Sequence, residues 1–317
     1  MDGVVYFGSE NSYLYAVDIQ TGEEKWRFKT GDRVHSSPAI AGGVVYFGSL
    51  DQYLYAVDSE TGRQIWNFET EGRVFAAPVI ADGVVYIGSD GPKSHDKHLY
   101  AVNLQTGQET WSFETEGGIV SPPAIADGIV YVGSEDGHLY AVNGQTGTEQ
   151  WRFGTERPVW FSGPAIAGGV VYFGSWDQNL YAVDIETGQE RWRFDGGEKI
   201  GDSQTIAGDA VYFGGGSDFY AVGLETGRQK WRFKTGGEVH GSASIGDGIV
   251  IFGSHDGKLY AVDAETGREM WRVSVSDGFA ASPAIADGVV YLGAGGGTLI
   301  GLDLHTGREV WKFDASQ

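Results

Sequence analysis

The chain of 317 residues is acidic, with 43 Asp and Glu against 22 Lys and Arg and a formal net charge of −21. A surface with this charge repels phosphate backbones, so we expect no nucleic acid partner. The absence of cysteine excludes disulfides, thiolate metal sites and cysteine nucleophiles. No apolar run approaches the roughly 20 residues of a membrane-spanning helix. No signal peptide is evident, and the compartment stays open.

The chain is built from eight copies of one short pattern. A Thr-Gly pair recurs at intervals of 39 to 45 residues, and a tryptophan follows each threonine by five positions. These tryptophans are Trp26, Trp66, Trp111, Trp151, Trp192, Trp231, Trp271 and Trp311. A period near 40 residues is typical of propellers and helical arrays.

Each repeat resolves into four expected strands, called A to D in chain order. Runs such as SSPAI, GVVYFGS, YLYAVD and KWRFKT are short, rich in β-branched and aromatic residues, and separated by turn residues. No run keeps a 3.6-residue period over the length of a helix. The sequence therefore predicts an all-β fold, an eight-bladed β-propeller of four-stranded antiparallel blades. We expect residues 1–317 to form one domain.

The first repeat begins with MDGVVYFGS, which is already strand B. Strand A is expected seven times, at residues 36–40, 76–80, 121–125, 162–166, 202–206, 241–245 and 281–285. The prediction is thus 31 strands, with a first blade that lacks its inner strand. The plainer explanation is a boundary of the sequence itself. The alternative is strand exchange, in which a partner's strand adds to an open edge.

Acidic residues recur at two turn positions of the repeat. The turn after strand C carries an Asp or Asn whose side chain can accept backbone N–H groups, at Asp18, Asp58, Asn103, Asn143, Asp184, Asp263 and Asp303. The turn between strands B and C carries Asp51, Asp136, Asp177 and Asp256. We interpret both sets as turn residues. The glycine runs at 214–217 and 293–298 are interpreted as B–C turns, since no helix follows them.

The pattern A-V-D-x-x-T-G-x-x-x-W resembles the repeat of pyrroloquinoline-quinone-type (PQQ-like) β-propellers. All eight copies carry T-G-x-x-x-W, so the resemblance covers the whole chain. It implies that the eight tryptophans dock against adjacent blades. The family includes quinoprotein dehydrogenases, the non-enzymatic assembly lipoprotein BamB and sensor domains of bacterial kinases, so the fold alone does not choose a function. It also implies an extracytoplasmic location.

The resemblance leaves an enzyme and a scaffold open. Quinoprotein dehydrogenases hold Ca²⁺ with carboxylates and amides, use a catalytic Asp and often have a cysteine pair. This chain has no cysteine and one visible insertion, residues 89–98, and it lacks G-x-S-x-G and H-E-x-x-H motifs. We therefore predict a non-catalytic scaffold without a cofactor or metal, which binds a protein segment or small ligand in a BamB-like assembly or sensor role. The alternative is a small dehydrogenase with PQQ and Ca²⁺.

Candidate binding residues are those that interrupt the repeat. Two tryptophans lie outside the motif: Trp160 in the link from strand D to the next strand A, and Trp176 in a B–C turn. D–A links and B–C turns emerge at the same end of an antiparallel blade, so we expect both on one face with Arg157 and Phe161. Trp160 aligns with valines of other repeats, Val34, Val74 and Val239, and filling a wider gap between blades is the competing interpretation.

Other candidates in the D–A links are Arg33, Arg73, Lys199, His35 and His240. The plainer interpretation of the two histidines is that they are structural residues of the blade wall. The plainer interpretation of Arg33, Arg73 and Lys199 is that they belong to a solvated rim. His95 and His98 form an H-x-x-H pair in the insertion, a weak metal signal.

Overall fold

The computed structural model describes residues 3–91, 96–275, 282–294 and 298–314. In these ranges the chain forms 31 strands in eight sheets and contains no helix that could cross a lipid bilayer. The predicted strand count and the eight blades are confirmed. Blade 1 has three strands, as predicted, and the other seven have four.

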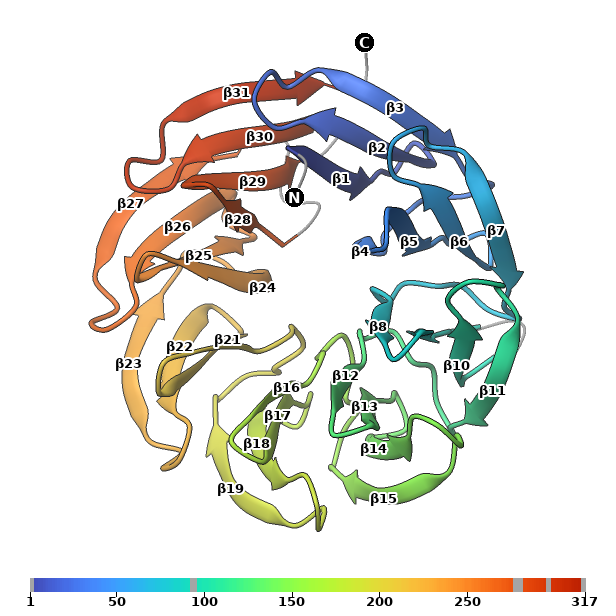
Figure 1. Cartoon of the computed structure of the whole chain (residues 1–317). Helices are drawn as coiled ribbons and strands as arrows, with labels where there is room; N and C mark the ends of the chain where they lie inside the picture. The colour runs from blue at the N-terminus through green and yellow to red at the C-terminus, as the bar shows by residue number, and fades with distance from the viewer. Residues whose placement is uncertain (1–2, 92–95, 276–281, 295–297, 315–317) are drawn as a thin grey trace. The chain divides into compact units, whose positions relative to one another are not determined.

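The chain divides into two compact units, Met1–Pro164 (unit 1, blades 1 to 4) and Ala165–Gln317 (unit 2, blades 5 to 8). The strands of unit 1 are β1 (Val4–Gly8), β2 (Tyr13–Asp18), β3 (Glu24–Lys29), β4 (Ala39–Ala41), β5 (Val44–Gly48), β6 (Tyr53–Asp58), β7 (Gln64–Glu69), β8 (Val79–Ala81), β9 (Val84–Gly88), β10 (His98–Asn103), β11 (Glu109–Glu114), β12 (Ala124–Ala126), β13 (Ile129–Gly133), β14 (His138–Asn143) and β15 (Glu149–Gly154). Figure 1 shows its sheets in succession, from blue to green.

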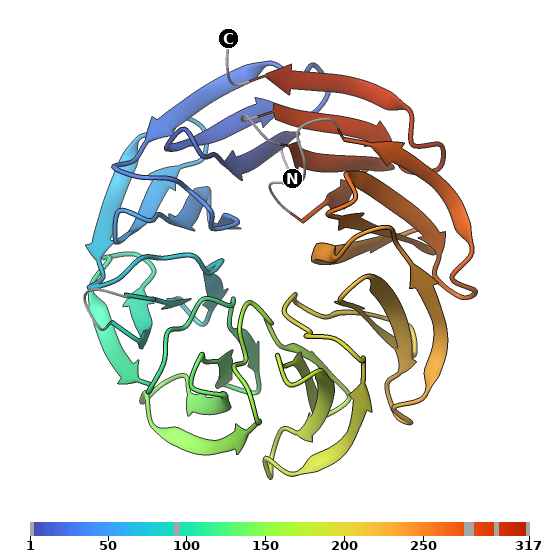
Figure 2. The ribbon, with the colours of Figure 1, turned by 180° about the vertical axis from the view of Figure 1, so that it is seen from behind.

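Unit 2 repeats the arrangement, and Figure 2 shows its sheets from behind, from yellow-green to red. Its strands are β16 (Ala165–Ala167), β17 (Val170–Gly174), β18 (Asn179–Asp184), β19 (Glu190–Asp195), β20 (Thr205–Ala207), β21 (Ala210–Gly215), β22 (Asp218–Gly223), β23 (Gln229–Lys234), β24 (Val239–Gly246), β25 (Ile249–Ser254), β26 (Lys258–Asp263), β27 (Glu269–Ser274), β28 (Ala284–Ala286), β29 (Val289–Ala294), β30 (Thr298–Asp303) and β31 (Glu309–Asp314).

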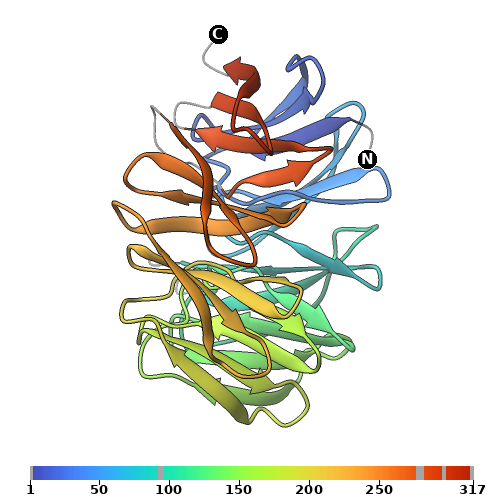
Figure 3. The ribbon, with the colours of Figure 1, turned by 90° about the vertical axis from the view of Figure 1, so that its left-hand side faces the viewer.

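Every sheet has its strands in chain order, each antiparallel to the next. A register shift recurs between strands C and D of all eight blades, as between Ala16 and Val17 in blade 1. Just before it, a small residue faces the repeat tryptophan, as Ala16 faces Trp26 and Gly301 faces Trp311. Such bulges strengthen strand twist, and the twist is visible from the side in the sheet β24–β27 (Figure 3).

Strand A is shorter than predicted in six of seven blades. The expected segment 36–40 is a strand only from Ala39 to Ala41, and the other short copies begin about three residues late as well. The reason is visible at Pro38, because proline has no N–H to donate to a sheet ladder. In blade 7 Ala243 takes the place of this proline, and β24 extends over eight residues. Gln204 replaces it in blade 6 without lengthening β20.

The hydrophobic core lies between successive sheets. One cluster joins Tyr46 and Leu54 of blade 2 to Val85 and Ile87 of blade 3, and similar clusters recur in both units. Strand β1 is half-buried along its whole length, whereas β5 of blade 2 is buried from its second residue on. The addition of a partner's strand to β1 stays a prediction.

The repeat tryptophan docks on the next blade, as the resemblance implied. In all six cases where both blades lie in one unit, the indole N–H donates to a backbone carbonyl of the next blade's C–D turn. The donors and acceptors are Trp26 to Ser59 (2.9 Å), Trp66 to Leu104 (3.2 Å), Trp111 to Gly144 (2.9 Å), Trp192 to Leu224 (2.9 Å), Trp231 to Ala264 (2.9 Å) and Trp271 to Leu304 (2.8 Å). The tryptophans therefore fix the spacing of successive sheets.

The glycine of the Thr-Gly pair serves this contact as well as its own turn. Gly107 has a φ of +69°, the left-handed region that was predicted. A β-carbon on Gly107 would also lie 2.7 Å from the indole of Trp66, which covers it from the preceding blade. The same pairing holds between Gly62 and Trp26. The motif glycine of one repeat thus forms the surface on which the motif tryptophan of the preceding repeat packs.

The predicted role of the acidic residues after strand C is confirmed. Asp58 accepts the backbone N–H of Thr61 at 2.8 Å and its hydroxyl at 2.7 Å. Asn103 accepts the corresponding N–H of Thr106 at 2.9 Å, so the amide replaces the carboxylate. The glycine run 214–217 is a B–C turn only in part, because Gly214 and Gly215 end β21 and pair with Phe219 and Asp218 of β22, so residues 216–217 alone form the turn. In the run 293–298, residues 295–297 lie outside the described ranges.

Candidate functional site

The D–A links are fixed by a buried aliphatic residue against the glycine that ends strand B. In blade 1, a β-carbon on Gly8 would lie 2.5 Å from the Val34 side chain, and the Val34 N–H donates to Ser9 at 3.2 Å. The equivalent aliphatic residues are Val34, Val74, Ile119, Val159, Ile200 and Val239. We call this buried valine or isoleucine the plug of its link. The plug holds the link in place, so the residue after it has a defined position.

The plug corrects the predicted alignment of Trp160. Val159, not Trp160, occupies the place of Val34, since its N–H donates to Ser134 at 3.1 Å and its side chain meets Gly133. Trp160 does not fill the valine gap; it aligns with the residue after the plug. The residues after the plug are His35, Phe75, Val120, Trp160, Gly201 and His240. This position varies widely from blade to blade, whereas the plug is always valine or isoleucine.

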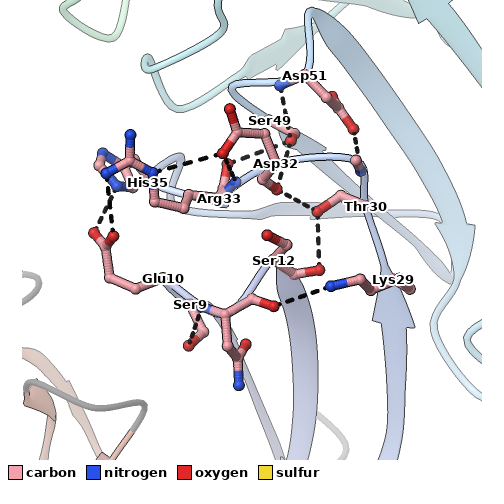
Figure 4. Close-up of polar contacts among 12 residues, drawn as sticks. Ser9, Glu10, Ser12, Lys29, Thr30, Asp32, Arg33, His35, Ser49 and Asp51 are labelled. Carbon is pink, nitrogen blue, oxygen red and sulfur yellow. Dashed lines mark hydrogen bonds and ion pairs between the residues drawn. The ribbon is translucent and has the colours of Figure 1, made fainter.

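In the link between blades 1 and 2, the predicted residues Arg33 and His35 both contact the carboxylate of Glu10 (Figure 4). Glu10, in the B–C turn of blade 1, lies 2.7 Å from Nε2 of His35 and 3.4 Å from the Arg33 guanidinium. His35 also meets the ring of Phe75 edge-on, with centroids 5.9 Å apart. The close-up confirms that links and B–C turns share one end of the blades. No sequence pattern singles out Glu10, which balances part of the positive charge there.

Trp160 and Phe161 are two stacked aromatic residues in the link that leaves blade 4, and we call this pair the aromatic step. Five positions separate Val159 from Pro164, against four between Val34 and Pro38, so the link holds one extra residue. Phe161 accommodates it with a φ of +58°. The Phe161 side chain is 44% exposed, and its ring stacks on Trp160 with centroids 5.1 Å apart. A bulky residue is strained in the left-handed region, and its exposed ring does not offset that strain by burial.

The predicted arginines of unit 1 are exposed. The backbone of Arg73 pairs with that of Asp90, with N–H to carbonyl distances of 2.7 and 3.0 Å. Burial raises the pKa of the Asp90 carboxyl, and Arg73 opposes the rise. Burial, together with Asp90, also raises the pKa of Glu135. In the link that leaves blade 4, the carbonyl of Arg157 accepts the Thr155 hydroxyl at 2.6 Å.

The predicted residues of unit 2 form a separate group. Lys199 lies over the ring of Trp176, with its Nζ 5.1 Å from the centroid, and pairs with Glu238 at 3.0 Å. His240 lies in β24, and its side chain is outside the described part. Trp160 and Trp176 belong to different units. Their sharing of one surface stays a prediction.

The histidines of the insertion and of blade 4 contact aspartates. His98 and His138 begin β10 and β14, and their Nδ1 atoms lie 2.6 Å from Asp96 and 3.0 Å from Asp136. His95, the other member of the H-x-x-H pair, is outside the described ranges. Across residues 3–91, 96–275, 282–294 and 298–314, no group of three His, Asp or Glu side chains could hold a metal ion.

The aspartates of the B–C turns act as predicted, with a second role that the sequence did not reveal. Asp51 accepts the Tyr53 N–H at 3.2 Å within its own turn. Its other oxygen accepts the Tyr55 hydroxyl at 2.8 Å and the Gly31 N–H, from the preceding link, at 2.6 Å. Asp51 therefore ties its turn to the link beside it, and Asp136 and Asp256 do the same in blades 4 and 7. Blade 6 has a shorter turn without this aspartate, and Tyr220 donates to the carbonyl of Gly196 at 3.0 Å instead.

Comparison with known proteins gives one family across the chain. The model described as "Outer membrane protein assembly factor BamB" matches residues 1–93, 70–195 and 216–317. Among curated protein sequences, none matches significantly.

Solved structures show the same fold at low identity. BamB from Moraxella catarrhalis is 19% identical, with a TM-score of 0.78 over 94% of this chain and 91% of that one. The computationally designed protein Ika8 is 19% identical, with a TM-score of 0.82 over 94% and 92%. Quinohemoprotein alcohol dehydrogenase ADHIIG from Pseudomonas putida HK5 is 18% identical, with a TM-score of 0.77 over 95% and 69%. With eight sheets of this topology, the fold is an eight-bladed β-propeller.

Proposed function

Because this chain belongs to the family of outer membrane protein assembly factor BamB, we propose that it is a non-catalytic scaffold that binds partners on its D–A/B–C face. The partner is a protein segment or a small ligand, in a BamB-like assembly role or a sensor role. The observation that carries the proposal is the aromatic step of Trp160 and Phe161. An exposed ring on a strained backbone fits a binding anchor better than a structural residue.

The neighbouring link residues support the same face. His35 and Phe75 place two more rings at the position after the plug, and Glu10 and Arg33 place a carboxylate and a guanidinium beside them. Aromatic and arginine side chains often dominate the binding energy of protein interfaces. The opposite end of the blades is made of repeated Asx turns, which vary little from copy to copy.

The variant Phe161→Asn separates binding from folding. Asparagine tolerates the left-handed region, so the variant should be more stable by about 1 kcal/mol. It should lose the anchor. A photo-crosslinking phenylalanine analogue at position 161 should capture discrete partners from an extract of the native host, and soluble wild-type protein, but not Phe161→Asn, should compete for them.

Ile65 supplies the control position, since it is an exposed apolar residue of β7 away from the links, with 51% exposure. The analogue at position 65 should capture none of these partners. Equal capture at both positions, or equal competition by both proteins, would refute the proposed face. Dye-linked dehydrogenase activity on addition of PQQ and Ca²⁺ would replace the scaffold with the enzyme alternative.

A further inference from the structure

The ends of strand D differ in charge from blade to blade. Blades 2 and 3 end in the sequence FETEG, at residues 68–72 and 113–117, whereas blades 1 and 6 end in FKTG. The four glutamates of the FETEG segments are all exposed: Glu69, Glu71, Glu114 and Glu116. These segments lead into the links of unit 1, so the carboxylates lie at the proposed binding face, on two successive blades.

A groove of about 340 Å³ opens beside the second FETEG segment, between β11 of blade 3 and β14 and β15 of blade 4. This volume is at the lower end of the about 300–1,000 Å³ typical of ligand pockets, so the groove has room for a long side chain. Phe113 and Tyr140 provide its apolar surface, with ring centroids 5.5 Å apart in an edge-on arrangement. Glu114, Glu116 and Glu149 also line it.

The cations of the groove are already engaged by its carboxylates. Arg152 pairs with Glu149 at 3.1 Å and lies 5.7 Å from the centroid of the Tyr140 ring. Lys97 reaches Glu114 only at 3.9 Å, a long surface pair that exchanges readily.

Glu116 adds a further negative charge. Its backbone N–H donates to Asp136 at 2.9 Å, which fixes its position. Its side chain is exposed and makes no salt bridge within the described ranges. The lined groove therefore carries more negative than positive charge beside an apolar ring.

We infer that this groove takes a lysine or arginine side chain from an extended basic segment of a partner protein. The aliphatic stem packs on Phe113, and the cationic head lies between Glu114 and Glu116. A second cation further along the segment meets Glu69 and Glu71 on blade 2. The inference rests on the proposed function and gives the partner its chemistry. Anionic lipid surfaces and phosphates are repelled by the same carboxylates.

The test uses the full chain and a fluorescent (Arg-Gly)₄ peptide, with (citrulline-Gly)₄ as the uncharged match. Anisotropy should show binding of the arginine peptide that weakens with salt and no binding of the citrulline peptide. Replacing Glu69, Glu71, Glu114 and Glu116 with Gln should lower affinity about ten-fold, because four exposed pairs each contribute a fraction of that factor.

A control variant removes the same charge from the opposite end of the blades, where exposed glutamates occupy the C–D turns. It carries Gln in place of Glu60, Glu186, Glu225 and Glu265. Its affinity should change less than about two-fold, since C–D turns lie at the end of their blades opposite to the links and salt screens exposed charges that make no direct contact. Equal losses in both variants, or binding of the citrulline peptide, would overturn the inference.

The outcomes also separate the inference from the proposed function. No arginine-peptide binding together with capture at position 161 removes the basic segment and leaves the scaffold. Failure of both experiments removes both.

Discussion

Adding one methyl group to Gly107 should destabilise the chain far more than adding it to Gly83. Both glycines lie in blade 3 and have a positive φ, +69° and +78°. A β-carbon on Gly83 meets nothing within 4 Å, whereas one on Gly107 lies 2.7 Å from the indole of Trp66. The two variants therefore share the backbone strain and differ in the contact with the preceding blade.

The magnitudes follow from these contacts. Alanine in the left-handed region costs roughly 1–2 kcal/mol, which is the whole effect expected for Gly83→Ala. In Gly107→Ala the indole must also move, and overpacking of this kind costs about 1–3 kcal/mol. The N–H bond from Trp66 to Leu104, 3.2 Å long, is weakened with it. We expect a total loss of about 2–5 kcal/mol in the free energy of unfolding.

Urea unfolding followed by tryptophan fluorescence measures both variants, with equal m-values as the check that only stability has changed. A Trp66→Leu background provides a second comparison, because the extra loss in Gly107→Ala should shrink once the indole is gone. Equal losses in Gly83→Ala and Gly107→Ala would refute the reasoning that the motif glycine is a docking surface.

Three further predictions concern the docking tryptophans, a turn carboxylate and the domain organisation. Trp231→Ala should cost about 3–5 kcal/mol and Trp231→Phe about 1 kcal/mol for the lost N–H bond, both measured by urea unfolding. No loss in Trp231→Phe would contradict the bond to Ala264, and equal losses in the two variants would contradict the packing of the ring. The Arg191 side chain, with bonds from Thr187, lowers the pKa of Asp184 to about 2. Because the pKa of Asp184 is lower in the folded chain than the value near 3.9 in the unfolded chain, its ionised carboxylate adds to the free energy of unfolding above about pH 4. This contribution is lost as the pH falls from about 4 to about 2. Asp184→Asn should flatten that part of the stability profile, and an unchanged profile would count against the pairing. Finally, calorimetry should show one thermal transition if residues 1–317 form one domain, and two separate transitions would show that units 1 and 2 unfold independently.

The repeat itself was predictable from the sequence because its contacts are encoded eight times. Glycine, tryptophan and the turn aspartates recur at fixed spacing, so strand order, turn type and blade number follow from local chemistry. The length of strand A was not predicted correctly, since Pro38 and its equivalents were included in the strand. A proline at the start of a β-rich run sets a boundary that composition alone conceals.

The candidate site was less predictable, because it depends on partners from different repeats. Glu10 and His35 are 25 positions apart, and no periodic signal pairs them. Trp160 was misaligned because one extra residue follows the plug, and an insertion of one residue is visible only once the structure places Val159 on Gly133. The hydrogen bond from the Gly31 N–H to Asp51 likewise joins neighbouring repeats, and no sequence pattern indicates it.

The pairing of each indole with the following repeat's glycine has a consequence for how such a gene can lengthen or shorten. Recombination that duplicates or deletes a stretch in phase with the 40-residue period gives every indole a glycine platform at the new junction. A duplication out of phase leaves one indole facing a side chain instead. Viable length variants should therefore differ by whole multiples of the period, wherever in the repeat the crossover falls.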